Sequence, residues 1–226
     1  MGDAAYRAGD FAAATEAYRA SAEEQLASGT LQNLGNAEWR RGHTAEAILA
    51  WEQALWVNPF DKNARNNLRF ARQAAQIEAP ELRWYEIASG WLPVNWWAWI
   101  VGGSLWTVVG ALILPGVLRL RRASWQQAVA ALALGIFLLS LPAHFGTMTR
   151  TRLGVVLPKD TPLRLTPTAG GEAFTRLAAG EPARLVRTRG NYLFIRTNRG
   201  AGWIERGQFA LICRPVTLLD ARTEPL

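Results

Sequence analysis

Apolar and polar positions over the first 60 residues follow a helical period, and the whole pattern occurs twice. Within each copy, small residues mark the points where two antiparallel helices turn and come close, and an aromatic residue fills the gap between neighbouring helix pairs. A constant offset of this kind predicts a repeated helical hairpin. Five pairs of such positions are each separated by 33 residues: Gly2 and Gly35, Gly9 and Gly42, Ala14 and Ala47, Tyr18 and Trp51, and Ser21 and Ala54.

The second copy is the more complete of the two. Its pattern consists of Leu34, Gly35, Gly42, Ala47, Trp51, Ala54 and Pro59. This pattern resembles tetratricopeptide repeats, although any helical hairpin places small residues in a similar way. Residues 61–75 continue with a helical pattern that is typical of a helix capping such a stack. We therefore expect residues 1–77 to form tetratricopeptide repeats plus a capping helix.

The resemblance implies that one face of the repeats binds partner proteins. By repeat position, this concave face holds Asp3, Tyr6, Arg7, Asn36, Trp39, Arg40 and Asn66. Asn36 and Arg40 lie one helical turn apart, so their side chains could together bind a peptide backbone or a carboxylate. The alternative for each of these residues is an ordinary hydrated helix face.

The repeat register also bears on the start of the chain. Gly2 lies about seven residues into a normal repeat, and two repeats plus a cap are fewer than the roughly three units that such stacks usually need. We therefore expect the N-terminus to be truncated. Another turn of helix and an export signal would then be encoded upstream.

Two long apolar runs without charged residues occupy the middle of the chain, after a linker of residues 78–92. They extend from 96 to 118 and from 125 to 145, and each is long enough to cross a hydrocarbon core of about 30 Å. Pro142 and His144 are expected to weaken the last turn of the second run. Residues 93–146 are thus predicted to form a transmembrane hairpin, because the alternative of two buried core helices would need a polar face. Indole side chains gather at the ends of the runs, where membrane interfaces favour them: Trp91, Trp96, Trp97, Trp99 and Trp125.

Charge around the hairpin predicts its orientation. The short loop between the two runs contains Arg119, Arg121 and Arg122, and the positive-inside rule places such a loop in the cytoplasm. Arg150 and Arg152 follow the second run and favour the opposite orientation, but the rule applies best to short loops. We therefore expect a multi-pass protein of the bacterial inner (cytoplasmic) membrane whose two flanking domains are periplasmic.

Small residues recur at four-residue spacing within both apolar runs. Gly103, Thr107 and Ala111 share one helix face in the first run, and Ala131 and Gly135 share one in the second. Small residues allow membrane helices to pack closely. We expect these faces to pack against each other within the hairpin, and the alternative is contact with a partner helix.

From residue 147 the pattern changes to short apolar or alternating segments separated by glycines, which predicts β-strands. The predicted strands are 155–157, 162–166, 182–188, 192–197, 202–205 and 209–213. Five or six short strands favour a small barrel over a sandwich. The motifs PLRL (162–165), GNY (190–192) and above all GAGWI (200–204) resemble bacterial SH3-like domains. Residues 147–226 are therefore predicted to form an SH3-like β-barrel.

Domains that these motifs resemble often bind peptides or cell-wall glycopeptides. The resemblance suggests Arg164, Tyr192 and Arg199 as ligand-binding residues, because cationic and aromatic groups hold carboxylates or stack on a ligand. The alternative for the arginines is a solvated face of the barrel. Trp203 is expected in the core.

The formal net charge of +7 is unevenly distributed. Residues 1–90 hold nine basic and twelve acidic residues, whereas residues 147–226 hold thirteen basic and six acidic ones. The basic character therefore belongs to the C-terminal part and gives no reason to expect nucleic-acid binding. A single cysteine, Cys213, excludes an internal disulfide and a cysteine metal cluster.

Catalytic motifs are not visible in the sequence. His43 lies in a repeat turn without a nearby nucleophile. His144 lies at the end of a span, where its side chain is expected to reach the membrane interface, and the alternative is a functional ionisable group within the membrane. Neither a glycine-rich phosphate loop nor a paired carboxylate motif is present. We therefore expect no catalytic residues, no metal site, no cofactor and no enzymatic activity.

The order of repeats, two apolar spans and an SH3-like domain resembles that of the BatE proteins of the aerotolerance operon. The resemblance implies an assembly partner that works beside von Willebrand A-domain membrane proteins and a MoxR-type ATPase, and it implies no reaction. We expect a multidomain α + β adaptor that binds partner proteins through its repeats. The alternative is an envelope sensor or cell-wall-binding regulator that recognises peptidoglycan through the SH3-like domain.

Overall fold

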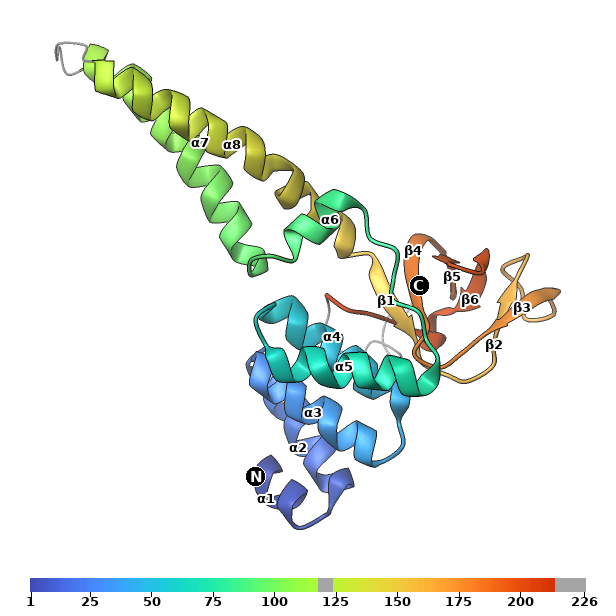
Figure 1. Ribbon diagram of the computed structural model, residues 1–226. Helices are drawn as coiled ribbons and strands as arrows, with labels where there is room; N and C mark the ends of the chain where they lie inside the picture. The colour runs from blue at the N-terminus through green and yellow to red at the C-terminus, as the bar shows by residue number, and fades with distance from the viewer. Residues whose placement is uncertain (118–123, 214–226) are drawn as a thin grey trace. The chain divides into compact units, whose positions relative to one another are not determined.

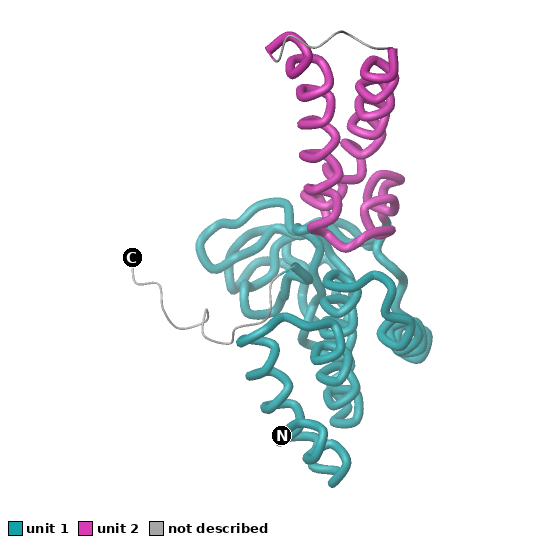
Figure 2. Tube along the Cα trace, turned by 90° about the vertical axis from the view of Figure 1, so that its left-hand side faces the viewer, with its two compact units in different colours: residues 1–81, 151–226 teal, residues 82–150 magenta. Residues whose placement is uncertain are grey.

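The chain folds into two compact units, shown in different colours in Figure 2. The computed structural model describes residues 1–117 and 124–213. One unit combines residues 1–81 with the chain after residue 150, and the other comprises residues 82–150. In the described part of the chain, eight α-helices precede the strands of one antiparallel sheet (Figure 1). The mixture of helices and sheet that the sequence predicts is therefore confirmed.

Residues before 81 form two helical hairpins and a fifth helix. Their bounds are α1 (Gly2–Arg7), α2 (Phe11–Glu24), α3 (Ser28–Arg40), α4 (Thr44–Val57) and α5 (Lys62–Ala75). Gly9 and Gly42 close the two hairpins with φ angles of +80° and +82°, a left-handed conformation that glycine adopts without a Cβ clash. Asp10 caps α2 by accepting a hydrogen bond from the Ala13 N–H, and Asp61 caps α5 in a similar way.

The two hairpins contain the same close approach at the predicted offset. A Cβ added at Gly2 would lie 2.6 Å from Cε1 of Tyr18, and one added at Gly35 would lie 2.5 Å from Nε1 of Trp51. Each glycine is therefore required by the ring that covers it, since real Cβ contacts are not this short. The interpretation of these glycines as repeated points of helix contact is confirmed. The aromatic ring of each copy covers the glycine of its own hairpin, whereas the sequence predicted it in the gap between neighbouring hairpins.

The rest of this unit is an antiparallel sheet of seven strands in the order β3-β2-β6-β5-β4-β1-β7. The bounds are β1 (Leu153–Val156), β2 (Thr161–Arg164), β3 (Ala173–Leu177), β4 (Pro182–Arg189), β5 (Tyr192–Thr197), β6 (Gly200–Glu205) and β7 (Phe209–Leu211). The sheet is not closed, because β3 and β7 are its edges. This differs from the small barrel of five or six strands that the sequence predicts.

Strand β3 is the one that the sequence pattern did not predict. It pairs with β2 in a register that places Thr161 opposite Leu177. Leu177 is its one buried residue, and the preceding residues are exposed or half-buried. An edge strand with so little buried surface lacks the apolar alternation by which strands are recognised.

The core of the sheet consists of apolar side chains from all seven strands. Its fully or nearly fully buried members are Val156, Leu163, Leu177, Ala183, Leu193, Ile195, Ile204 and Phe209. Trp203 is buried as expected, and Gly202 allows the backbone to approach Leu163, whose Cγ would lie 2.8 Å from an added Cβ. The GAGWI motif therefore serves packing.

The second unit contains α6 (Trp84–Ser89), α7 (Val94–Val117) and α8 (Ser124–Arg150). Helices α7 and α8 have 24 and 27 residues, pack along each other, and are long and apolar enough to cross a membrane (Figure 1). Two expectations are corrected here. The predicted linker contains the helix α6, and Pro142 does not weaken the end of α8, which continues to Arg150. The basic loop of Arg119, Arg121 and Arg122 lies outside the described residues.

The contact between α7 and α8 does not use the small residues expected from the sequence. Gly103 and Thr107 are exposed, and an added Cβ at Gly103 or Gly135 would meet nothing within 4 Å. The prediction that these faces pack within the hairpin is therefore wrong for Gly103 and Thr107. From residue 104 to residue 140, the buried residues of the two helices are instead Ser104 and Pro115 of α7 and Ala130, Ala133 and Ser140 of α8.

Candidate protein-binding site

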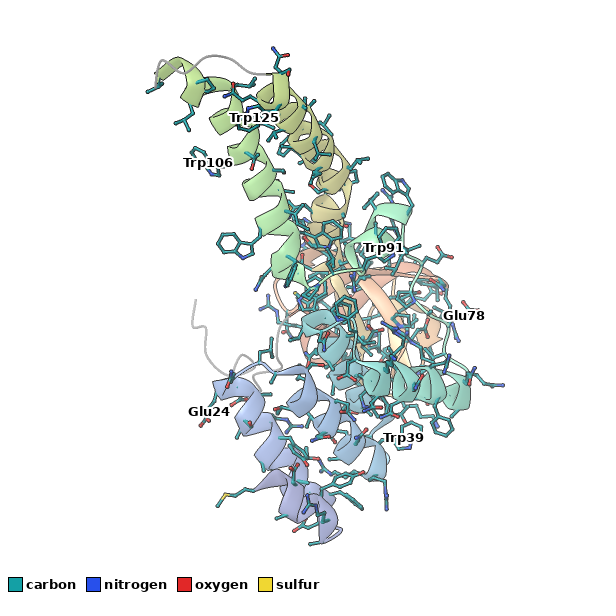
Figure 3. All side chains as sticks on the ribbon, turned by 60° about the vertical axis from the view of Figure 1, so that its left-hand side comes forward. Glu24, Trp39, Glu78, Trp91, Trp106 and Trp125 are labelled. Carbon is teal, nitrogen blue, oxygen red and sulfur yellow. The ribbon has the colours of Figure 1, made fainter. Side chains whose placement is uncertain are left out.

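Aromatic and cationic side chains gather on the helices that carry the predicted concave face. Tyr6 of α1 and Phe11 of α2 meet edge to face with their ring centroids 5.3 Å apart. The guanidinium carbon of Arg40 lies 4.6 Å from the centroid of Phe11, within the range of a cation–π interaction. Trp39 of α3, labelled in Figure 3, contacts the ring of Phe70 of α5 at 5.8 Å.

This arrangement brings some of the predicted residues together. Arg40 and Tyr6 share Phe11 as a neighbour, although the sequence analysis did not single out Phe11. The prediction also omitted Phe70, which is 59% exposed although it is apolar and packs on Trp39. Aromatic side chains and arginine are both enriched in protein interfaces. The remaining predicted residues Arg7 and Asn66 are exposed at other points of α1 and α5, where Asn66 accepts a hydrogen bond from Arg69.

Asn36 has a second role that the sequence did not reveal. Its side-chain oxygen accepts hydrogen bonds from Trp51 Nε1 at 3.3 Å and from Asn67 Nδ2 at 2.8 Å. These bonds connect α3 with α4 and α5. Arg40 stacks on Phe11 instead of sharing a partner with Asn36, so the structure contains no preformed pair of these two side chains for binding a carboxylate.

Asp3 is likewise held by the fold. Its carboxylate accepts a hydrogen bond of 2.6 Å from the hydroxyl of Tyr18. Burial, together with this hydrogen bond and the charge of Asp3, raises the pKa of Tyr18 to about 12. The hydrogen bond from Tyr18 therefore holds Asp3 at the start of α1.

A cavity of about 310 Å³ lies on α2, α3 and α4, and none of the residues predicted for the concave face lines it. Its most buried charged residue is Glu38, whose side chain is 2% exposed. Arg19 of α2, Arg41 and His43 contact the two carboxylate oxygens at 2.8, 3.2 and 2.9 Å. Because these partners come from α2, the end of α3 and the turn that follows, Glu38 ties the first hairpin to the second. The other lining residues are Glu16, Ala22, Glu23, Leu31, Leu34, Glu46, Leu49, Ala50, Gln53 and Leu157.

The sequence contains a signal for Glu38 that the analysis did not use. Leu31 and Leu34 precede it at helical spacing on one buried face of α3, so a carboxylate at that spacing falls inside the repeat. A charged residue on an apolar face is rarely buried unless it is paired. This pattern predicts the cluster of cations that the structure places around Glu38.

The three residues predicted in the SH3-like domain do not form one site. Tyr192 begins β5 and Arg199 follows its end, so about 20 Å of extended strand separates them. Arg199 contacts Glu181 at 3.4 Å and donates to the Arg176 carbonyl oxygen. Arg164 donates to the carbonyl oxygen of Gly171 at 2.9 Å.

A more compact cluster on the sheet was not predicted. The exposed Arg187 lies 4.8 Å from the ring centroid of Phe194 and 5.1 Å from that of Trp203. The two rings are themselves 5.2 Å apart. Arg187 therefore covers these aromatic rings, and the cation already occupies the position where a ligand would stack.

Among residues 1–117 and 124–213, no group of three or more His, Cys, Asp or Glu side chains is placed to hold a metal ion. His43 lies in the turn before α4, as predicted, and contacts Glu38. The Cys213 thiol donates to the carbonyl oxygen of Thr151 at 3.1 Å.

Comparison with known proteins assigns no function to the chain, so its function is inferred from these surfaces. No protein-family model, curated protein or solved structure matches the chain. The resemblances to tetratricopeptide repeats, SH3-like domains and BatE proteins therefore rest on the residues that carry them. The aromatic and cationic side chains on α1, α2, α3 and α5 have a composition that protein interfaces share.

Proposed function

We propose that the chain is a non-enzymatic adaptor that is anchored in a membrane and binds partner proteins through its tetratricopeptide-like repeats. The single observation that supports this most is that two consecutive residues of α3 make ring contacts with other helices of the repeats: Arg40 with Phe11, and Trp39 with Phe70. Arg40 and Phe70 are exposed there, yet each packs on a neighbouring ring, so neither side chain loses much freedom when a partner covers it.

The proposed anchor is the hairpin of α7 and α8. Both helices are long and apolar enough to cross a bilayer, and their leucine and tryptophan side chains are largely exposed. The repeats and the sheet would then lie on one side of the inner membrane, on the periplasmic side if the predicted orientation holds. The partner classes follow from the resemblance to BatE proteins: membrane proteins with von Willebrand A domains that work with a MoxR-type ATPase.

A second candidate is an envelope sensor or regulator that binds peptidoglycan through the SH3-like domain. Its support is charge: residues 147–226 hold thirteen basic and six acidic residues, which suits an anionic polymer. The separation of Tyr192 from Arg199 and the internal contacts of Arg164 weigh against one preformed site. We therefore rank this candidate second.

The test compares two double variants of the full chain in native membranes. Arg40→Ala with Phe70→Ala removes the centre of the proposed face. Lys62→Ala with Phe60→Ala is the matched control, because it removes the same charge and a phenylalanine that is also 59% exposed. The readout is the set of membrane proteins that co-purify after cross-linking, identified by mass spectrometry.

We expect the first variant to lose its co-purifying partners and the control to retain them. Both variants should show the same melting curve, because exposed substitutions usually change stability by no more than about 0.5 kcal/mol. Equal retention of partners by both variants would refute binding through this face. Binding of purified murein by the full chain, unaffected by either variant, would favour the second candidate.

A further inference from the structure

The short helix α6 carries large apolar side chains on its outer side. Trp84 is 68% exposed, Ile87 is 52% exposed and Trp91, just after the helix, is 66% exposed. Figure 3 labels Trp91 at this position. Three side chains of this size within eight residues form a concentrated apolar surface, because a soluble protein normally buries such groups.

The inner side of α6 is fixed to the other helices of the same unit. Glu86 and Ser89 are each 1% exposed. Arg150 of α8 donates to the Ser89 hydroxyl at 3.2 Å, and Trp97 of α7 donates through Nε1 to the Ser89 carbonyl oxygen at 3.0 Å. These bonds leave the outer side of α6 in a fixed orientation relative to the hairpin.

Gly146 allows α6 to pack closely against α8. A Cβ added at Gly146 of α8 would lie 2.2 Å from the carbonyl oxygen of Tyr85 and 3.0 Å from Cβ of Ser89. No other residue type fits without displacing α6. The ring of Tyr85 also contacts Phe145 at 5.6 Å between centroids. The helix therefore belongs to the hairpin and is not a flexible connection.

The position of the attachment along α8 corresponds to the edge of a bilayer. Trp125 and Gly146 are 21 residues apart (146 − 125), which is about 32 Å of helix at about 1.5 Å per residue. The hydrocarbon core of a bilayer is about 30 Å thick. If Trp125 lies at one interface, α6 meets α8 at the level of the other.

We propose that α6 is a lipid-binding element that lies in the membrane interface, with Trp84, Ile87 and Trp91 inserted between the headgroups. Indole rings prefer this region because it accepts both their apolar body and their N–H group. Continuity with the hairpin supports the same occupant, since Trp96 and Trp99 at the start of α7 are also exposed. The exposed Arg83 at the beginning of α6 suits anionic headgroups. This inference rests on the proposed anchoring of the hairpin in a membrane.

The test uses the purified full chain in nanodiscs of phosphatidylcholine and phosphatidylglycerol. Cys213→Ser removes the single native thiol, and an environment-sensitive fluorophore (NBD) is attached to a cysteine at one position at a time. Ile87→Cys and Trp84→Cys report on α6. Leu139→Cys, at a residue 83% exposed within α8, is the membrane reference, and Lys62→Cys on α5 is the aqueous reference. Nitroxide-labelled lipids then quench the fluorophore from a shallow or a deep position.

We expect labels at 87 and 84 to emit at shorter wavelength than the label at 62. Shallow nitroxides should quench them more strongly than deep ones, with the order reversed at 139. Emission and quenching at 87 and 84 equal to those at 62, with 139 quenched, would overturn the inference while the anchored hairpin stands. An unquenched label at 139 would refute the anchoring itself. Labels at 87 and 84 could instead emit at shorter wavelength than the label at 62 in native membranes but not in nanodiscs. That result would assign the surface to a protein partner and would also overturn the proposal.

Discussion

Helices α4 and α8 are both rich in apolar residues, but they place them differently. In α4, Ile48 and Trp51 are almost completely buried within their own unit. In α8, Leu132 and Leu139 are strongly exposed, and the buried residues are mostly alanine, serine and glycine. The first pattern is that of a helix in a protein core. The second is that of a helix whose surroundings are apolar.

The difference has an energetic meaning. Leaving a leucine in water instead of burying it forgoes about 1.5–3 kcal/mol, and α8 and α7 expose many such residues. In a bilayer the same exposure costs nothing, because lipid chains are as apolar as leucine. Burial therefore separates two kinds of apolar helix that hydropathy alone does not distinguish. The predictions below test this contrast, from the largest expected effect to the smallest.

Tryptophan substitutions provide the sharpest contrast. Trp51→Ala removes a buried ring that covers Gly35, and we expect a loss of about 3–5 kcal/mol, which is enough to unfold the repeats. Trp106→Ala is the matched control, because Figure 3 shows Trp106 on the outer side of α7 and its ring is largely exposed. Thermal unfolding of the full chain in nanodiscs, followed by circular dichroism, measures both. Equal effects of the two substitutions would contradict the contrast.

Glycine substitutions test the same contrast on a smaller scale. In Gly35→Ala the new Cβ would meet the Trp51 ring, so we expect a loss of about 1–3 kcal/mol from overpacking. Gly103→Ala meets nothing within 4 Å and should be neutral or stabilising, by up to about 1 kcal/mol, because alanine favours helix. The melting temperatures of the two variants measure this difference in stability. A destabilised Gly103→Ala protein would mean that this face of α7 is occupied.

Removal of the Glu38 carboxylate should weaken the repeats in a similar range. Glu38→Ala leaves Arg19 and Arg41 without the partner that joins α2 to α3, and a lost charged hydrogen-bond partner costs about 1–3 kcal/mol. Glu24→Ala, at an exposed position at the end of α2, is the control and should change stability by less than about 0.5 kcal/mol. Urea unfolding curves compare the two. A neutral Glu38→Ala substitution would show that the ion cluster is not a structural link.

Asn36→Ala sharpens the comparison between binding and folding roles. From the sequence alone, truncation of Asn36 with Arg40 is expected to leave stability near its original value. The structure changes this expectation, because Asn36 accepts hydrogen bonds from Trp51 and Asn67. We expect a loss of about 1 kcal/mol for Asn36→Ala and almost none for Arg40→Ala. Equal melting curves for the two variants would restore the original interpretation.

The effect that is smallest at neutral pH is confined to alkaline conditions. The pKa of Tyr18 is raised from 10.0 to about 12 in the folded protein, chiefly by burial. Because the unfolded state releases this proton first, the contribution of neutral Tyr18 is complete below about pH 10 and is lost as pH rises towards 12. The stability of a Tyr18→Phe variant should therefore fall less steeply above pH 10 than that of the unchanged chain. Parallel curves would contradict the assignment.

The sequence predicts those parts of the fold in which neighbouring residues carry the signal. The repeat offset predicts that Gly35 lies where two helices come close, and apolar length predicts α7 and α8. Strand β3 escapes prediction because an edge strand buries little, and its place in the sheet depends on pairing with β2. Helix α6 escapes because six residues are too few for a period to be recognised, and its stability comes from contact with α8.

The candidate site was predictable only at the level of a face. The repeat register places Trp39 and Arg40 on α3, but it does not show that Arg40 lies over Phe11 or that Asn36 is engaged by Trp51. Such contacts join residues that are far apart in the sequence, so they depend on how the helices pack. The same holds for Arg19 and Glu38, whose pairing connects two hairpins.

The division of the chain has a consequence for biosynthesis. Residues 1–81 and the strands after residue 150 belong to one unit, but the 69 residues from 82 to 150 separate them in the chain. At a synthesis rate of about 5–20 residues per second, the ribosome needs roughly 3–14 s to make this stretch. During that interval the repeats have left the ribosome without the sheet that completes their unit. The contacts between α4 and β1 can therefore form only after residues 82–150 have been made.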